Sequence, residues 1–346
     1  MRVVLFVPAP LATVSGGYNY DRAVVAGLRR AGHAVEVVEL AGCHPLPDAT
    51  AEAAARDGWA ALAADAIPVI DGLCLPSFAA LAESLAARRT IGLIHHPTAL
   101  EPDRDEAARE ALRRAECTLF RQLARVIVTS SATAERLATE FGVLAERLAV
   151  VVPGTDPAPR SEGSGGPGCT ILSVGVLTPR KGHDVLLRAL GRLPDLDWTL
   201  TIAGGARDAA YAATLHVLAA ELDLAGRVTF AGELVAEALE AWWRRADLFA
   251  LATRFEGYGM AIAEALRRGV PVAVTDGGAA GALVTPQTGV VAAVGDAAAL
   301  SRALRRLIFD RPLREVMRDA AWRAGQALPD WTSQTAAFAA VLAEGE

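Results

Sequence analysis

The sequence predicts an α/β protein built from two doubly wound halves, each a parallel sheet with helices on both faces. Three observations lead to this prediction. Short apolar runs, typical of buried parallel strands, alternate with longer amphipathic segments along nearly the whole chain. The alternation is interrupted once, at residues 153–168 (PGTDPAPRSEGSGGPG), a stretch rich in proline, glycine and serine. After this break, the same order of strand and helix starts again.

In the first half, apolar runs predict the strands, and each is followed by a helical segment. The expected strands are residues 2–7, 35–40, 67–70, 90–94, 126–129 and 148–152. The expected helices are 18–31, 77–87, 104–123 and one that Ser130 and Ser131 begin with a side-chain cap. Gly32 is placed to end the first helix in the left-handed conformation. Residues 42–64, rich in proline and alanine, fit neither pattern and are left unassigned.

The second half repeats this organisation. The expected strands are residues 170–174, 198–202, 228–230, 247–251, 271–275 and 290–291. The expected helices are 182–193, 209–222, one ending near Arg245, one after Gly259, one that Asp296 caps, 311–326 and 332–344. We therefore predict a first domain at 1–157, a flexible linker at 158–168, a second domain at 169–325 and a terminal helical segment at 326–346.

Composition narrows the class of protein. The chain has 346 residues, of which 52% are hydrophobic and 21% charged, as in ordinary soluble enzymes. No apolar run approaches the ~20 residues of a membrane-spanning helix. The net charge of −6 gives no reason to expect a nucleic-acid partner. The four cysteines show no metal-binding spacing and indicate a reducing, cytoplasmic location.

Residues 254–266 (RFEGYGMAIAEAL) link a buried strand to a helix through a glycine loop. Backbone N–H groups at a helix start, together with the helix dipole, form an anion site. Glu256 and Glu264 bracket this site and could accept hydrogen bonds from hydroxyl groups. The pattern suits a ligand in which a diphosphate joins a sugar to a ribose. Taken alone, it fits an ordinary loop acid and a solvated helix carboxylate equally well.

Three further groups fall where parallel strands end. Arg180 and Lys181 follow strand 170–174 and could neutralise a diphosphate, although a lone basic pair is more often solvated. His95 and His96 follow strand 90–94 and could bind a hydroxyl or a phosphate; loop packing is the alternative, and their adjacency is not metal-ligand spacing. The pair Gly16–Gly17 opens the first helix without a GxGxxG motif, so a simple tight turn is its alternative.

Seven motifs in order give the chain a resemblance to a known family. They are Gly16–Gly17, HHP from His95, TSSATAERL from Thr129, VVPGTDP from Val151, VGVLTPRKG from Val174, FEGYGMAIAEAL from Phe255 and GVPVAVTDGG from Gly269. In this order the chain resembles the retaining glycosyltransferases of family 4. Glu256 and Glu264 match the E-x7-E pair of that family. The resemblance implies the GT-B fold, two Rossmann-like domains facing each other across a cleft, with the final helix crossing back to the first domain.

The resemblance also implies roles for residues. His95, Glu256 and Lys181 would be catalytic. The donor would be bound by Gly16, Gly17, Arg180, Lys181, Glu256, Gly257, Tyr258, Gly259, Met260 and Glu264. Within this set, Glu264 would hold the ribose and Lys181 the diphosphate. The chain departs from the family at Val176, where an arginine is common, and Arg180 is the nearest substitute.

The implied activity is that of a retaining hexosyltransferase. A sugar would pass from a UDP-, GDP- or ADP-sugar to a sugar, lipid or small-molecule acceptor, by same-face attack and without a metal or cofactor. Domain closure would exclude water. The alternatives are a sugar-nucleotide epimerase or hydrolase of the same shape and a non-catalytic nucleotide-sugar binding partner. The resemblance leaves open peripheral contact with the inner membrane and whether His95 or His96 faces the donor.

Overall fold

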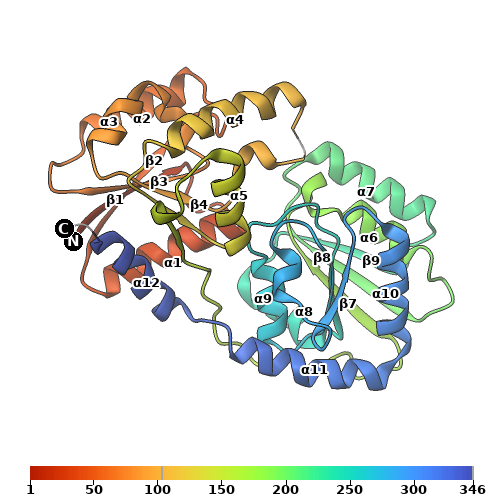
Figure 1. The fold of residues 1–346 in the computed structure, drawn as a ribbon. Coiled ribbons are helices and arrows are strands. Elements are labelled where there is room, and N and C mark those ends of the chain that lie inside the picture. Colours follow the sequence, from red (N-terminus) through yellow and green to blue (C-terminus); the bar gives the residue numbers. More distant parts are fainter. Residues whose placement is uncertain (103, 345–346) are drawn as a thin grey trace. The chain divides into compact units, whose positions relative to one another are not determined.

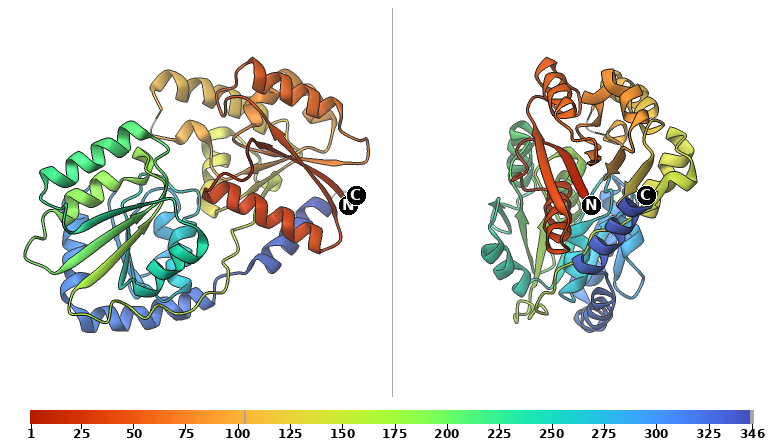
Figure 2. Two further views of the ribbon diagram at one scale, coloured as in Figure 1. Left: turned by 180° about the vertical axis from the view of Figure 1, so that it is seen from behind. Right: turned by 90° about the vertical axis from the view of Figure 1, so that its left-hand side faces the viewer.

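A computed structural model describes residues 1–102 and 104–344, which divide into two compact units. The first unit comprises Met1–Gly154 with Pro329–Glu346, and the second comprises Thr155–Leu328. Each unit is a six-stranded sheet in which all strand pairs are parallel, with helices on both faces (Figures 1 and 2). The predicted α/β class, with two doubly wound halves, is confirmed.

The first sheet has the strand order β2-β1-β3-β4-β5-β6. Its strands are β1 (Arg2–Pro8), β2 (Ala34–Leu40), β3 (Ile67–Asp71), β4 (Ile91–Ile94), β5 (Arg125–Val128) and β6 (Leu148–Val150). Alternate residues of β1 enter two different cores, Val4 and Phe6 on one face and Val3 and Leu5 on the other. The chain order reverses between β1 and β3, and ligands of such sheets bind beyond the carboxyl ends of the strands at that point.

Helices cover both faces of the first sheet (Figure 1). One face packs on α1 (Gly16–Arg30) and α12 (Trp331–Ala343). The other packs on α2 (Ala49–Ala60), η1 (Leu75–Leu81), α4 (Glu106–Phe120) and α5 (Ser131–Phe141), with α3 (Ala82–Ala87) following η1. As predicted, Ser130 caps α5 by accepting a hydrogen bond from the N–H of Thr133. Gly32, just beyond α1, has φ of +86°.

The C-terminal helix α12 packs on the first helix, α1. The indole of Trp331 meets the Tyr20 ring edge-on at 5.6 Å, and Gly27 leaves room for Thr335 against α1. Gly154 packs on the backbone of Asp330 and Trp331, so the chain leaves and re-enters this unit at adjacent points.

The second sheet has the order β12-β11-β10-β7-β8-β9. Its strands are β7 (Cys169–Val174), β8 (Trp198–Ala203), β9 (Val228–Gly232), β10 (Leu248–Leu251), β11 (Val272–Thr275) and β12 (Gly289–Ala292). One face packs on α6 (His183–Leu190), α7 (Ala209–Glu221) and α10 (Ala297–Phe309), and the other on α8 (Ala236–Arg245) and α9 (Met260–Arg267). Helix α11 (Arg311–Gln326) contributes side chains to the cores on both faces. Chain order reverses between β7 and β10, which places a second binding edge there.

Three segments differ from expectation. The unassigned stretch 42–64 contains α2, which Asp48 caps through the N–H of Ala51. The helix expected at 77–87 begins as the 3-10 helix η1, near Pro76, which has no N–H to donate. Residues 158–168, expected to be a flexible linker, run along the second unit: Ser161 donates its N–H to Arg268 O at 2.9 Å and its hydroxyl to Ala246 O at 2.8 Å.

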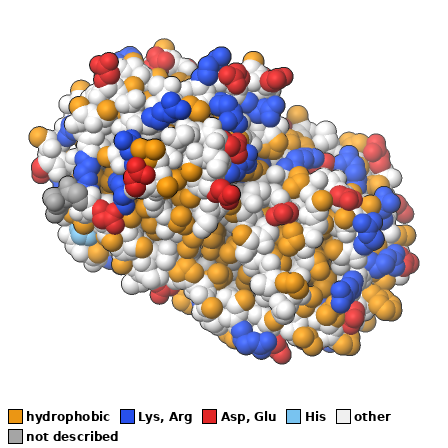
Figure 3. All heavy atoms as spheres, in the orientation of Figure 1, with side chains coloured by type: hydrophobic (Ala, Val, Ile, Leu, Met, Phe, Trp, Pro, Cys, Tyr) orange, Lys and Arg blue, Asp and Glu red, His pale blue; other side chains and the backbone are white. Residues whose placement is uncertain are grey.

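Helix length and surface charge are the features that distinguish membrane-spanning and nucleic-acid-binding proteins from other classes. Over the described residues, none of the helices is long and apolar enough to cross a membrane. On the face drawn in Figure 3, basic and acidic side chains are interspersed rather than gathered into one basic field.

Candidate functional site

The second unit brings two predicted loops together at its binding edge. Strands β7 and β10 are neighbours, so the loop after β7, which carries Lys181, lies beside the loop after β10, which carries Glu256. The backbone joins the loops, because the N–H of Arg254 donates to Arg180 O at 2.7 Å. Gly182 has φ of +65°, and a Cβ there would lie 1.9 Å from Ala252 O, so only glycine permits this approach.

Lys181 and Glu256 form a buried ion pair at this edge. The Lys181 Nζ donates to Glu256 Oε1 at 2.6 Å, and the Thr253 hydroxyl lies 3.1 Å from the same oxygen. The side chains of Lys181 and Glu256 are only 14% and 9% exposed. Burial raises the pKa of Glu256, but Lys181 and Arg180 more than offset this and leave it below its ordinary value. Glu256 is therefore a carboxylate, held against a cation.

Arg180 reaches the same carboxylate from the next position in the loop. Its guanidinium donates to Phe255 O at 2.8 Å and lies 3.9 Å from Glu256 Oε1. Val176, where the resemblance leads one to expect an arginine, has no charged side chain. Its carbonyl oxygen lies 3.3 Å from Nε2 of the buried His183, which is also 3.2 Å from Gly175 O. Burial and the charge of Lys181 lower the pKa of His183 to about 4, so a neutral imidazole donates here.

The start of α9 follows directly. Gly259 precedes the helix with φ of +103°, and no side chain caps it. The carbonyl oxygen of Gly259 is the first acceptor of the helix, and it accepts hydrogen bonds from the N–H groups of Ile262 and Ala263. The preceding N–H groups, those of Met260 and Ala261, therefore have no acceptor within the helix. Tyr258 is buried, which raises its pKa to about 12. The geometry is that of an anion site beside two cations.

Glu264 lies on α9, one turn beyond this start, and is half-buried. Its carboxylate oxygens accept no hydrogen bond from the residues that the structure describes. Burial raises the pKa of Glu264 to about 7, although Arg268 and Lys181 act in the opposite direction. This carboxylate has acceptor capacity that the protein leaves unused.

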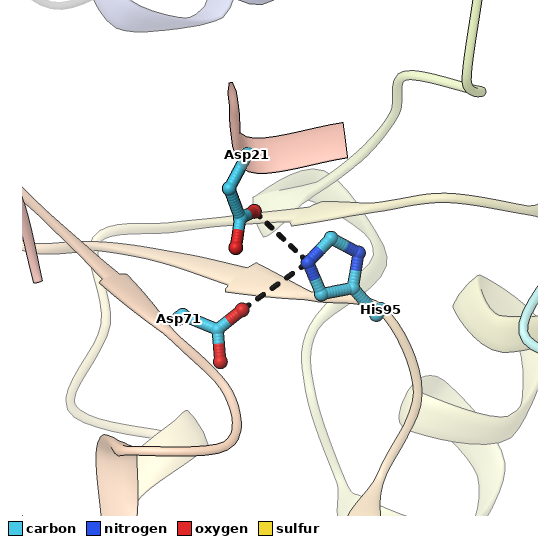
Figure 4. Close-up of side chains that lie close together, drawn as sticks. All are labelled: Asp21, Asp71 and His95. Atoms are coloured by element: carbon cyan, nitrogen blue, oxygen red, sulfur yellow. Dashed lines mark hydrogen bonds and ion pairs between the residues drawn. The ribbon is translucent and has the colours of Figure 1, made fainter. Parts of the chain in front are cut away.

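The first unit holds a second cluster at its own binding edge (Figure 4). His95 follows β4, and its Nε2 lies 3.0 Å from Asp21 Oδ1 and 3.2 Å from Asp71 Oδ2. Asp71 ends β3, and Asp21 comes from α1. Burial raises the pKa of Asp21 to about 6 despite the nearby His95. These ligand atoms lie within 4.8 Å of one another, close enough to share an ion, but Nε2 already serves both carboxylates.

The other predicted residues of the first unit lie around this cluster. Gly17, in the first turn of α1, faces the His95 ring, and a Cβ there would lie 3.2 Å from it. Gly16 is the first residue of the same helix. His96 contacts Glu101, with Nε2 2.9 Å from Oε1, so its imidazole holds the loop after β4. The predicted residues thus form two clusters, one in each unit.

The second unit matches proteins of a known family. Residues 156–323 match the family model described as "Glycosyl transferases group 1". The D-inositol 3-phosphate glycosyltransferase of Mycobacterium sp. (strain KMS) is 34% identical over 184 residues, which are 50% of this chain and 41% of that protein. The second unit, which contains the whole match to the family model, belongs to the glycosyl transferases group 1 family. The chain spans less than half the length of that curated relative.

Solved structures match the fold of both units. Sucrose-phosphate synthase from Thermosynechococcus elongatus matches with a TM-score of 0.84 at 19% identity, covering 99% of this chain and 98% of that one. Anabaena HepE in complex with UDP-glucose matches with a TM-score of 0.78 at 21% identity, covering 99% of each chain. The predicted GT-B fold class is confirmed by these likenesses, which concern the fold alone.

Asp21 and Asp71 were not predicted from the sequence. Asp71 carried a usable signal, because it is the last residue of an apolar strand, at the edge where the other candidates were sought. Asp21 carried a weaker one. It precedes Val24, Val25 and Leu28 by three, four and seven positions, and a carboxylate on that buried helical face requires a partner.

Proposed function

We propose that this protein is a retaining glycosyltransferase of family 4 type, which moves a sugar from a nucleotide-diphosphate sugar to an acceptor hydroxyl without a metal ion. The observation that carries the proposal is the buried Lys181–Glu256 pair beside the uncapped start of α9. This arrangement lies inside the segment that matches the group 1 family. The UDP-glucose named for the HepE structure supports a nucleotide-sugar donor.

The reaction must stabilise negative charge that grows on the leaving diphosphate. Lys181, Arg180 and the free N–H groups of Met260 and Ala261 supply positive charge and hydrogen-bond donors at one place. Three such contributions can replace the divalent ion that would otherwise hold a diphosphate. The acceptor attacks from the face that the diphosphate leaves, and the leaving phosphate oxygen takes the acceptor's proton, so retention needs no covalent carboxylate intermediate.

Two carboxylates would bind the hydroxyl groups of the nucleotide sugar. Glu264 has unused acceptor capacity, which suits the two hydroxyl groups of a ribose. Glu256 would accept from sugar hydroxyls through the oxygen that Lys181 does not contact. The four cysteines are free, in keeping with a reaction in the cytoplasm.

A second candidate function follows from Val176. Without an arginine at this position, the unit has one cation fewer for a diphosphate. A binding partner that holds a nucleotide sugar and does not turn it over would tolerate that loss. Binding without product would identify it.

The proposal is tested by a thermal-shift screen with UDP-, GDP- and ADP-sugars, followed by product analysis. A ligand at 100 times its dissociation constant stabilises the folded state by about 2.7 kcal/mol. We expect one nucleoside to produce such a shift and Glu264→Ala to reduce it. Product formed with an acceptor, unaffected by a chelator and with the donor's anomeric configuration by NMR, would complete the assignment. Absence of any shift would contradict it.

We expect donor binding to strengthen with pH through the titration of Glu264. Ribose hydroxyls donate best to an ionised carboxylate, and the pKa of Glu264 is about 7. Donor affinity should therefore rise about tenfold between pH 6 and pH 8, with one proton released below pH 7. The stability of the protein without ligand depends on pH in the opposite direction. The folded state holds the proton of Glu264 more tightly than the unfolded state does, so the free energy of unfolding falls as pH rises from 4.5 to 7.

Calorimetric titration with the nucleotide sugar at pH 6, 7 and 8 measures this effect. Glu264→Gln keeps the shape of the side chain and removes the titration, so its affinity should not change over this range. An equal rise in the wild type and in Glu264→Gln would assign the pH dependence to another group.

A further inference from the structure

One ring nitrogen of His95 contacts two carboxylates. Its Nε2 lies 3.0 Å from Asp21 Oδ1 and 3.2 Å from Asp71 Oδ2 (Figure 4). Asp21 and Asp71 are 1% and 3% exposed, so water cannot take the place of the imidazole as their partner. Three different parts of the fold supply the three side chains: α1, β3 and the loop after β4. Such a contact is part of the fold and not a chance surface pair.

The contact fixes the proton on Nε2. A bare nitrogen there would set its lone pair against two carboxylate oxygens. The charged and titratable groups around the cluster are Asp21, Asp71, Tyr20, Arg22, His44 and Cys74. Burial lowers the pKa of His95, but the two aspartates more than offset this and raise it to about 10. Arg22 acts on the Asp21 carboxylate, while its guanidinium donates to Leu11 O and Thr13 O.

The other nitrogen remains available. Nδ1 lies on the far side of the ring from both carboxylates (Figure 4). None of the residues in the ranges 1–102 and 104–344 hydrogen-bonds to it, and the side chain is 18% exposed. The absence of a Cβ at Gly17 leaves the ring edge in close contact with the start of α1. The ring is thus anchored at one end and open at the other.

We propose that Asp21 and Asp71 are positioning residues that hold His95 as an imidazolium, whose Nδ1–H donates a hydrogen bond to a sugar hydroxyl oxygen. Two carboxylates outweigh one imidazolium, so the cluster has no net positive charge and suits a neutral hydroxyl better than a phosphate. It also follows that His95 cannot be the base that takes the acceptor's proton. The inference rests on the proposed glycosyl transfer and deepens it.

The charge state is tested first by ¹⁵N NMR of histidine-labelled protein, which needs no activity. The His95 signals are assigned by their loss in His95→Gln. We expect both ring nitrogens to stay protonated through pH 8.5 in the wild type. Asp71→Asn and Asp21→Asn should each lower the midpoint by about one to three pH units. Asp65, an exposed aspartate of the same unit, forms an ion pair with Arg2, and Asp65→Asn is the matched control that should change nothing.

A wild-type midpoint near 6.5, or a midpoint that neither aspartate variant moves, would overturn the inference; if neither variant folds, the wild-type midpoint alone decides. The role is tested by kcat/KM against pH. Because Glu264 affects all variants alike, kcat/KM is compared with that of the wild type at each pH. We expect this ratio to fall with rising pH in Asp71→Asn and to stay constant in Asp65→Asn. A constant ratio in Asp71→Asn despite an altered NMR midpoint would also overturn the inference.

The source of the hydroxyl is separated by calorimetry with nucleotide sugar alone. Weaker donor binding in His95→Gln assigns the hydroxyl to the donor; unchanged donor binding with a raised acceptor KM assigns it to the acceptor; no change in either contradicts the hydrogen bond. If no nucleotide sugar binds or reacts in the wild type, the proposed function fails, while the NMR midpoint still decides the charge state of His95.

Discussion

Lys181→Met is expected to abolish nearly all transfer activity and to destabilise the protein. The substitution leaves the Glu256 carboxylate buried, with its nearest cation removed and Arg180 still 3.9 Å away. Breaking a buried ion pair on one side costs about 3–5 kcal/mol in the free energy of unfolding. Loss of the charge that faces the diphosphate should lower kcat by about 10²–10³-fold. Denaturant unfolding and transfer assays at saturating donor measure the two effects.

The double variant Lys181→Met with Glu256→Gln separates stability from catalysis. Without the carboxylate there is no unpaired buried charge, so most of the lost stability should return while activity stays low. Arg305→Met breaks an exposed pair with Asp195 and should change neither quantity appreciably. If the double variant regained activity together with stability, Lys181 would have only a structural role.

Gly182→Ala is expected to destabilise the second unit and to displace Lys181. A Cβ at Gly182 would lie 1.9 Å from Ala252 O, and φ of +65° is unfavourable for alanine. The left-handed conformation costs about 1–2 kcal/mol and overpacking about 1–3 kcal/mol, so a loss of about 2–5 kcal/mol is expected. Because the backbone of Ala252 must move, the loop that carries Glu256 moves with it, and donor affinity should also fall.

Gly226→Ala is the control for Gly182→Ala. No atom lies within 4 Å of a Cβ at Gly226, and its backbone is not in the left-handed region. Denaturant unfolding should therefore give a free energy close to that of the wild type. Equal loss in the two variants would show that the contact with Ala252 is not what makes glycine necessary at position 182.

The sequence predicted the fold well because strands buried on both faces are continuous apolar runs, and all the strands were located. Helix ends were predicted where a side chain caps them, as at Ser130 and Asp296. The α2 helix was missed because alanine dominates it and gives no strong apolar periodicity. Residues 158–168 were predicted to be flexible from composition, which cannot reveal that Ser161 hydrogen-bonds to the second unit.

The site was predictable in part for a similar reason. Lys181, Glu256 and His95 all follow strands, and the carboxyl ends of parallel strands share one edge. Whether the lysine and the carboxylate touch depends on which strands are neighbours, and β7 and β10 lie far apart in the sequence. Asp21 lies on a helix, so only the packing of α1 against β3 and β4 could bring it to His95.

The crossing of the chain between its two units has a consequence for how the protein is made. The first unit needs α12, and every residue of the second unit precedes this helix in the chain. A ribosome therefore releases a complete second unit before the first one can close over Tyr20 with Trp331. Until α12 has emerged, the face of the first sheet that this helix covers is only partly shielded, and it is this nascent surface that chaperones would meet.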